Sequence, residues 1–165
     1  MRRRITGFVR DEQDDWVALL DCGHRQHVRH RPPFTNRPWV TTEAGRAEQL
    51  GRELPCALCD RFEMPSDFAA YKRTPAFTEA TVPQGLLRDH STKAGVWAQI
   101  RVLDGTLRYH VPSLSRQFDL TPDAPGIVIA EVVHHVEPLG PVRFYVEFFR
   151  ASELASASCR ARPGA

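Results

Sequence analysis

The sequence predicts a mainly β protein with two parts, a small α+β domain over residues 1–65 and a small β-barrel or jelly roll over residues 66–154. The first part is identified by a hairpin pattern, a helix pattern and a cluster of cysteines and histidines. The second part is identified by short β-rich runs that are separated by turn residues and contain no convincing helix pattern. Residues 155–165 are rich in Ala, Ser and Arg, and we expect a flexible tail there.

The first domain contains two strand patterns, a helix pattern and the turns that join them. The expected strands are Arg3–Arg10 and Trp16–Leu20, and an acidic turn at Asp11–Asp15 joins them. A loop is expected at Arg31–Arg37. Thr42 is suited to cap a helix from Glu43 to about Leu54, because apolar residues recur there at helical spacing. Pro55 is expected to end this helix.

Cysteine and histidine residues gather in two short stretches of this domain: Cys22, His24, His27 and His30 in the first, Cys56 and Cys59 in the second. A Cys-x-x-Cys turn lets two thiolates point at one tetrahedral ion, and thiolate-rich ligand sets favour zinc. Cys22 and His24 would share one face of a strand, which favours His24 over the other two histidines. The predicted zinc ligands are therefore Cys22, His24, Cys56 and Cys59, with His27 or His30 as a substitute for His24.

The predicted site makes the first domain zinc-ribbon-like. A domain of this size buries little apolar surface, and a structural ion would supply the missing stability. The alternatives are a reduced dithiol pair, cysteines that only pack in the interior, and a catalytic ion with three protein ligands and a bound water. Cys159 lies in the small, polar tail, and we expect it to be unpaired.

Eight β-rich runs follow residue 66, and several of them alternate apolar and polar residues. The runs are Ala70–Thr78, Gly85–Arg88, Val96–Leu103, Thr106–Val111, Arg116–Leu120, Gly126–Ile129, Val132–Val136 and Val142–Phe149. Asp104-Gly105 separates two of them and is a typical hairpin signal. Many short strands without a helix favour a barrel or jelly roll.

Four segments of the second domain carry a resemblance to a known family: Val82–Trp97, Ile100–Arg108, Val133–Glu137 and Phe144–Phe149. In motif, spacing and order they resemble the TehB-like family, which is associated with tellurite resistance and whose domain is cupin-like. The resemblance covers roughly Tyr71–Leu154 and implies a double-stranded β-helix, or jelly roll. In that family the domain occurs alone in small bacterial proteins or ahead of a methyltransferase. The sequence shows no methyltransferase segment after it, so we do not expect methylation.

Residues 3–65 resemble a separate small bacterial family of unknown function. The likeness is carried by Cys22-Gly23-His24, His27–His30, Pro32-Pro33-Phe34, Arg37-Pro38-Trp39-Val40 and the Cys56-x-x-Cys59 pair. This resemblance implies no activity, but it supports a boundary between two domains.

The cupin-like resemblance implies a second site inside the barrel, because cupins usually hold a metal with histidines and one carboxylate. The residues that fit are His90, His134 and Glu147, and such a set with open positions suits Fe(II), Mn, Ni or Zn. The sequence departs from the usual pattern, since it has no His-x-His motif before Gly105 and Ala98 stands where a Glu is expected. The alternative is that His90 and His134 are hydrogen-bonded polar residues at the mouth of the barrel.

Charge and composition limit the partners. The formal net charge is +2, and residues 1–65 and 66–165 each contain eleven basic and ten acidic residues. This balance does not favour a nucleic-acid partner, although Arg25, Arg29, Arg31 and Arg37 could form a basic-aromatic surface with Phe34 and Trp39. The cysteines, read with the histidines beside them, indicate a reduced site and a cytoplasmic protein. No apolar run approaches the roughly 20 residues that span a bilayer, and no secretory signal is present, so we expect no membrane partner.

These observations lead to three functional hypotheses. The first is a metal-binding, stress-associated protein whose barrel binds a small molecule, an oxyanion such as tellurite by resemblance, or a second divalent metal. The second is a metal-dependent cupin enzyme that acts on a small molecule, and the third is a nucleic-acid-binding zinc module with a ligand-sensing barrel. The sequence contains no nucleotide-binding or Gly-x-Ser-x-Gly motif and identifies no catalytic residue. It is compatible with a homodimer.

Overall fold

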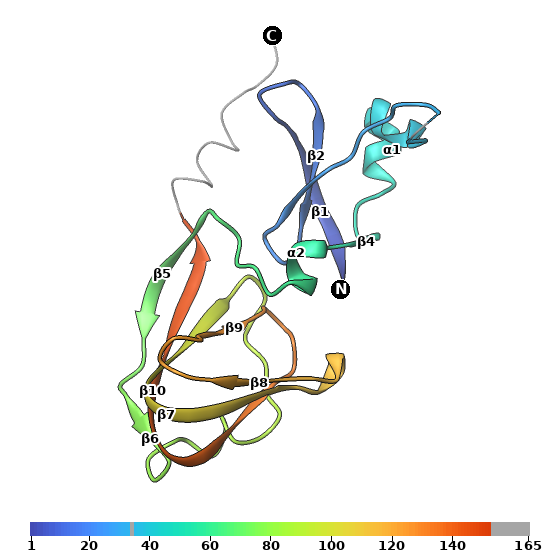
Figure 1. Ribbon diagram of the computed structural model, residues 1–165. Coiled ribbons are helices and arrows are strands. Elements are labelled where there is room, and N and C mark those ends of the chain that lie inside the picture. Colours follow the sequence, from blue (N-terminus) through green and yellow to red (C-terminus); the bar gives the residue numbers. More distant parts are fainter. Residues whose placement is uncertain (34, 153–165) are drawn as a thin grey trace. The chain divides into compact units, whose positions relative to one another are not determined.

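The computed structural model describes residues 1–33 and 35–152. The contacts between residues divide the chain into two compact units, one that spans Met1–Arg61 and a second that begins at Phe62 (Figure 1). We call them the first and the second unit and describe each by itself. The flexible tail predicted for residues 155–165, with Cys159, lies outside the described residues, as does Phe34.

The first unit is built on a four-stranded antiparallel sheet with the strand order β3-β2-β1-β4. Its strands are β1 (Arg2–Arg10), β2 (Trp16–Leu20), β3 (Arg25–His27) and β4 (Glu53–Pro55). Strand β1 alternates, so that Arg3 and Ile5 are buried while their neighbours in the sequence are exposed. Because β1 pairs with β2 on one side and β4 on the other, it joins two segments that are far apart in the sequence.

The helical part of the first unit is shorter than the sequence predicts. It consists of a 3-10 turn (Pro38–Thr41) and two short helices, α1 (Glu43–Ala47) and α2 (Ala57–Asp60). The Thr42 cap is confirmed, because its hydroxyl oxygen accepts a hydrogen bond from the Gly45 N–H at 3.1 Å. The predicted helix to Leu54 is wrong. Gly51 has a φ of +79°, which turns the chain so that it can pair with β1 as β4.

The second unit is a six-stranded antiparallel sheet, and the mainly β class is confirmed. Its strands are β5 (Phe68–Arg73), β6 (Phe77–Thr78), β7 (Trp97–Val111), β8 (Arg116–Leu120), β9 (Gly126–Val128) and β10 (His135–Ala151). The order is β5-β10-β7-β8, with β6 paired to β10 and β9 paired to β7. The sheet does not close on itself in the described residues, so the predicted cupin-type barrel is not confirmed. No helix among the described residues is long and apolar enough to cross a membrane.

Two long strands, β7 and β10, organise this sheet and lie side by side in Figure 1. The hairpin predicted at Asp104-Gly105 is wrong, because β7 continues through these residues. Gly105 has a φ of +78° and opposes Val142, where the register of the pair shifts. The glycine therefore bends a continuous strand rather than ending it. The run Gly85–Arg88 forms no strand; within it, the Leu86 carbonyl accepts a hydrogen bond from the Val136 N–H at 2.9 Å.

The hydrophobic core of the second unit lies on the inner face of β7 and β10. Leu107, Tyr109, Val111 and Phe144 are at most 1% exposed. The first unit contains fewer large buried side chains, and its interior includes Cys22, His24, Cys56 and Cys59. We therefore expect the cysteine and histidine cluster to contribute much of the stability of the first unit.

The bend in β7 leads to the first prediction. In Gly105→Ala, the new Cβ would overlap the Pro141 carbonyl oxygen and the backbone would keep an unfavourable positive φ. We expect a loss of about 3 kcal/mol in the free energy of unfolding, measured by urea denaturation. Gly140→Ala is the matched control, since its φ is +129° but a Cβ meets nothing within 4 Å. The control should lose only about 1 kcal/mol; equal losses would mean that the close approach to Pro141 does not matter.

Candidate functional site

Cys22 and His24 lie in the turn that joins β2 to β3, not on a strand as the sequence argument assumed. The Gly23 N–H donates to the Leu20 carbonyl at 2.8 Å, and the Leu20 N–H donates to the His24 carbonyl at 3.0 Å. Gly23 has a φ of +90°, a conformation that glycine adopts without cost. This tight turn directs both side chains into the interior of the first unit, where Cys22 is 0% and His24 4% exposed.

Cys56 and Cys59 lie on the other side of β1, at the start of α2. The Cys56 N–H donates to the Met1 carbonyl at 2.7 Å, and the Asp60 N–H donates to the Cys56 carbonyl at 3.2 Å. On the opposite edge, the Asp21 N–H donates to the Arg4 carbonyl at 2.9 Å. Strand β1 thus fixes both the turn that carries Cys22 and the helix that carries Cys59.

The four side chains converge on one point. The Nδ1 atom of His24 lies 3.5 Å from Cys22 Sγ, 3.4 Å from Cys56 Sγ and 3.5 Å from Cys59 Sγ. All four potential ligand atoms lie within 4.8 Å of one another. Tetrahedral zinc–sulfur and zinc–nitrogen bonds would separate sulfur and nitrogen by about 3.6 Å. The buried cluster of Cys22, His24, Cys56 and Cys59 could therefore hold a metal ion, and its spacing fits a small tetrahedral one.

The sulfur atoms of the cluster share protons and charge. A hydrogen bond from the Cys59 thiol is the main cause that lowers the pKa of Cys22 to about 4, which keeps this sulfur as a thiolate. The same hydrogen bond raises the pKa of Cys59, because losing its proton would place a second negative sulfur beside the first. A bound cation would remove this obstacle and allow all three sulfurs to be deprotonated.

Arg3 is the residue near this cluster that sequence reasoning missed. The residue is 8% exposed, and its positive charge opposes the rise in the pKa of Cys59 that the hydrogen bond to Cys22 and burial cause. Three thiolates and a neutral imidazole around a divalent ion have a net charge of about −1, which a buried guanidinium offsets. The strand pattern contained the signal, since Arg3 shares the inward face of β1 with Ile5.

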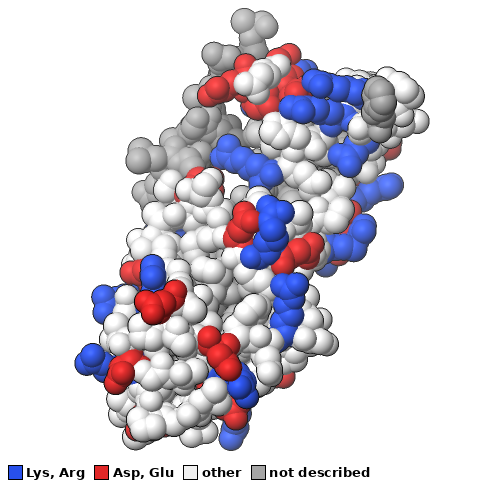
Figure 2. Space-filling model, viewed as in Figure 1, with Lys and Arg blue, Asp and Glu red and all other residues white. Residues whose placement is uncertain are grey.

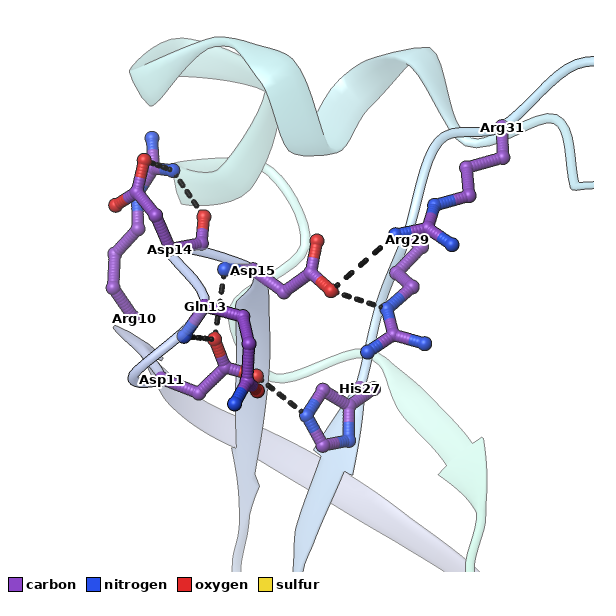
Figure 3. A network of polar contacts seen from close by, with 8 residues as sticks. All are labelled: Arg10, Asp11, Gln13, Asp14, Asp15, His27, Arg29 and Arg31. Carbon is purple, nitrogen blue, oxygen red and sulfur yellow. Dashed lines mark hydrogen bonds and ion pairs between the residues drawn. The ribbon is translucent and has the colours of Figure 1, made fainter.

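His27 and His30 do not join the cluster. Figure 3 shows His27 directed toward Asp11, with 2.7 Å between Nε2 and Oδ2. The N–H groups of Asp15 and Gln13 donate to Asp11, and together with His27 they hold the pKa of this carboxyl below its usual range. His30 Nδ1 accepts a hydrogen bond from the Arg37 N–H at 3.0 Å. His24 is thus the histidine that the fold brings to the three cysteines.

Two arginines of the predicted basic-aromatic surface pair with the same acidic group. Asp15 pairs with Arg29 at 2.6 Å and with Arg31 at 3.6 Å, as Figure 3 shows. On the face seen in Figure 2, basic side chains are interspersed with acidic ones. The Trp39 ring packs against Phe8, with the ring centroids 5.9 Å apart. Two of the four arginines predicted for the basic-aromatic surface are thus paired with an acidic group.

The second unit contains a cavity of about 500 Å³. Its lining residues are mostly apolar: Thr74, Phe77, Pro83, Gly85, Leu86, His90, Ser91, Ala98, Ile100, Val128, His134, Val136, Phe144, Val146 and Phe148. Apart from the two histidines, its polar side chains are only Thr74 and Ser91, and no Asp, Glu, Lys or Arg is among the described residues that line it. The cavity therefore suits an uncharged molecule better than an ion.

His90 and His134 lie next to each other at this cavity. Their backbones exchange two hydrogen bonds, His90 N–H to His134 carbonyl at 3.0 Å and His134 N–H to His90 carbonyl at 2.8 Å. The centroids of their rings are 4.3 Å apart, and the His134 ring also meets Tyr109 edge to face at 5.7 Å. Burial is the main cause that lowers the pKa of His134 to about 4.

Glu147 does not meet these histidines. It lies between Val146 and Phe148 on β10, and both of these neighbours line the cavity. Glu147 pairs with Gln99 of β7 and therefore faces the other side of the sheet. From the sequence, Glu147 is expected to point into a closed barrel beside the two histidines. The register of β10 instead places it on the face of the sheet opposite the cavity. Within the described part of the chain, the Cys22, His24, Cys56 and Cys59 set is the one group of three or more potential ligands found close together.

Two family matches cover successive parts of the chain. Residues 6–63 match a family described as "Protein of unknown function (DUF3565)". Residues 72–146 match the family of TehB-like domains. The resemblance of the second part to TehB-like proteins is thus confirmed, and the first part matches a family whose description states no function.

A curated relative agrees with the second match, and two solved structures have a similar fold over part of the chain. The chain is 34% identical over 47 residues to a probable S-adenosyl-L-methionine-dependent methyltransferase TehB of Haemophilus influenzae, which covers 28% of this chain and 16% of that protein. The crystal structure of TehB from Haemophilus influenzae has a TM-score of 0.50 and 23% identity, and covers 62% of this chain and 38% of that chain. A crystal structure of an Escherichia coli K12 protein has a TM-score of 0.50 and 21% identity, and the match covers 55% of this chain and 97% of that chain. At these identities the structures support the fold alone.

The second prediction tests the metal cluster through Arg3. Replacing Arg3 by Met removes the buried charge beside the sulfurs, and we expect metal affinity to fall about 10- to 100-fold. Arg2→Met is the control, because Arg2 is exposed and pairs with Glu53. Competition with a chromophoric chelator measures both affinities. Cys56→Ser should lower the affinity further and melt the first unit, and an unchanged metal content in that variant would contradict the ligand set.

The third prediction concerns pH. The pKa of His134 is about 4 in the folded protein, and its ordinary value is 6.5. As the pH is lowered, the unfolded chain therefore binds a proton at this residue at a higher pH than the folded chain does. Stability is full above pH 6.5 and falls as the pH drops toward 4, by at most about 3 kcal/mol. His134→Gln should lose this part of the pH dependence. The free energy of unfolding is measured at each pH by urea denaturation, with the NMR signals of β7 residues as the probe. An identical pH profile in the variant and the parent protein would mean that folding does not lower the pKa of His134.

Proposed function

We propose that this protein binds a small, uncharged molecule in the cavity of its second unit, while a structural zinc ion stabilises its first unit. The observation that carries the proposal is the cavity itself. Its volume of about 500 Å³ falls within the usual range of small-molecule sites, and apolar side chains surround a few polar ones. Such a composition is typical of ligand pockets rather than of packing defects, which are small and dry.

The first unit supports a structural role for the ion. Four protein ligands would complete the tetrahedral coordination of zinc and leave no open position for a substrate. The ligands come from both ends of the unit, and few large apolar side chains are buried there. Binding of the ion would therefore contribute directly to the folding of this unit.

The geometry favours a binding protein over a metal-dependent enzyme. With Glu147 on the opposite face, the described residues at the cavity offer two imidazoles and no carboxylate. The methyltransferase activity named for the Haemophilus relative is not carried over, because the match covers 16% of that protein. The cavity lining contains no Lys or Arg that could pair with an oxyanion such as tellurite. An uncharged ligand therefore suits this lining better.

The fourth prediction tests ligand binding with a variant that fills the cavity. Ala98 lines the cavity and is 1% exposed, so Ala98→Leu should occupy part of its volume. Ala70→Leu on β5 is the control, because Ala70 is exposed and lies away from the cavity lining. We expect compounds from a library of uncharged fragments to shift the NMR signals of Ile100, Val128 and Val146.

These shifts should disappear in Ala98→Leu and persist in Ala70→Leu. Native mass spectrometry of the full chain should also reveal one zinc ion per chain. If the fragments bind only to the first unit, or bind equally well to both variants, the cavity is not the ligand site. If zinc is absent while the first unit remains folded, the structural role of the ion is wrong.

A further inference from the structure

Resting on the proposed function, we propose that the ligand is a mainly apolar molecule with a hydroxyl group, such as a phenol, and that this hydroxyl donates a hydrogen bond to Nε2 of His134 or His90. The proposal names the chemical group that the polar end of the cavity recognises. It depends on the orientation, protonation and neighbours of the two imidazoles.

The orientation of His134 fixes which ring nitrogen carries a proton. Its Nδ1 atom lies 2.8 Å from the Val132 carbonyl oxygen, which can only accept a hydrogen bond. Nδ1 must therefore carry the hydrogen, and in the neutral ring Nε2 carries a lone pair. Since the side chain is 4% exposed and lines the cavity, the cavity is where this acceptor can find a donor.

His90 is held in the same way. Its Nδ1 atom lies 2.9 Å from the Arg88 carbonyl oxygen, so Nδ1 donates and the neutral ring again offers Nε2 as an acceptor. Neither Nε2 atom has a hydrogen-bond partner among residues 1–33 and 35–152. The two backbone hydrogen bonds between His90 and His134 keep the rings close together. Either Nε2 atom can therefore accept a hydrogen bond from the same ligand hydroxyl.

The protonation state of His134 disfavours an anionic ligand beside its ring. Burial lowers the pKa of His134 to about 4, so its ring is neutral at neutral pH and does not attract an anion. Its ring meets the His90 and Tyr109 rings, and His135 and Asp89 are also close enough to act on its charge, with His135 lowering the pKa of His134 and Asp89 raising it. The Thr74 hydroxyl oxygen accepts a hydrogen bond from the Val146 N–H at 3.0 Å, and its O–H, like that of Ser91, can still donate. The two imidazoles are therefore the groups of the cavity that can only accept, and apolar side chains such as Phe144 and Val146 line it elsewhere.

A ligand without a donor would leave the buried acceptor unpaired after displacing water from it. Sites built around a buried hydrogen-bonding group discriminate strongly against analogues that cannot pair with it. We therefore expect a phenol to bind at least about tenfold more tightly than its methyl ether. A carboxylate of the same shape should bind more weakly than either, because no cation in the lining answers it.

The fifth prediction uses three probes of one shape with the zinc-loaded full chain: 4-phenylphenol, 4-methoxybiphenyl and biphenyl-4-carboxylate. Binding is measured by NMR titration at neutral pH. Replacing both histidines in His90→Phe/His134→Phe keeps flat rings of similar size but removes both acceptors, so the preference for the phenol over the ether should be lost. His110→Phe is the control; His110 pairs with Glu137 and does not line the cavity.

Each outcome separates the inference from the proposed function. Equal affinity for the phenol and the ether, at the cavity, would overturn the hydroxyl inference and leave the binding function intact. Stronger binding of the carboxylate would overturn it in favour of an anion. If added zinc or nickel shifts the His90 and His134 signals and displaces the phenol, the imidazoles are metal ligands and the inference is wrong. If none of the probes reaches the cavity of the folded protein, the proposed function fails as well.

Discussion

The pairing of β7 with β10 is the interaction on which the second unit depends. It extends from Trp97 opposite Phe149 to His110 opposite His135, and two shifts of register bend it on the way. Residues on one face of this pair, such as Ile100 and Phe144, form the core and the cavity, whereas Glu147 lies on the other face. Whether a side chain can take part in ligand binding is therefore decided by its register in this one pair of strands.

In the first unit, β1 has the corresponding role. A small domain with few large buried side chains cannot depend on its core alone, and its interior is instead occupied by sulfur and imidazole groups. Strand β1 pairs on both edges, so the Cys22 turn and the Cys56 helix start meet near it. It also supplies Arg3, whose positive charge lies beside the thiolates. Sheet pairing and metal chemistry thus stabilise the same arrangement.

The two units differ in how their polar groups are used. In the first, charged surface groups neutralise one another, as in the Asp15 pairs with Arg29 and Arg31, and the buried polar groups are potential metal ligands. In the second, two imidazoles at the cavity, the buried one of His134 and the half-buried one of His90, have their Nδ1 atoms bound to backbone carbonyls. The carbonyls fix the tautomer, and burial keeps the His134 ring neutral. The histidines of this protein therefore have different chemical roles according to their neighbours.

The sequence by itself determined the features that depend on local chemistry: the strand at Trp16–Leu20, the Thr42 cap, the cysteine and histidine types that can bind a metal, and the likeness to TehB-like domains. Only the tertiary structure decided which histidine meets the cysteines, that Glu147 faces away from the cavity, and that β7 continues through Asp104-Gly105. The reason is that these outcomes depend on contacts between residues far apart in the chain. A shift of one residue in strand pairing moves a side chain to the opposite face, and local sequence patterns contain little information about that register.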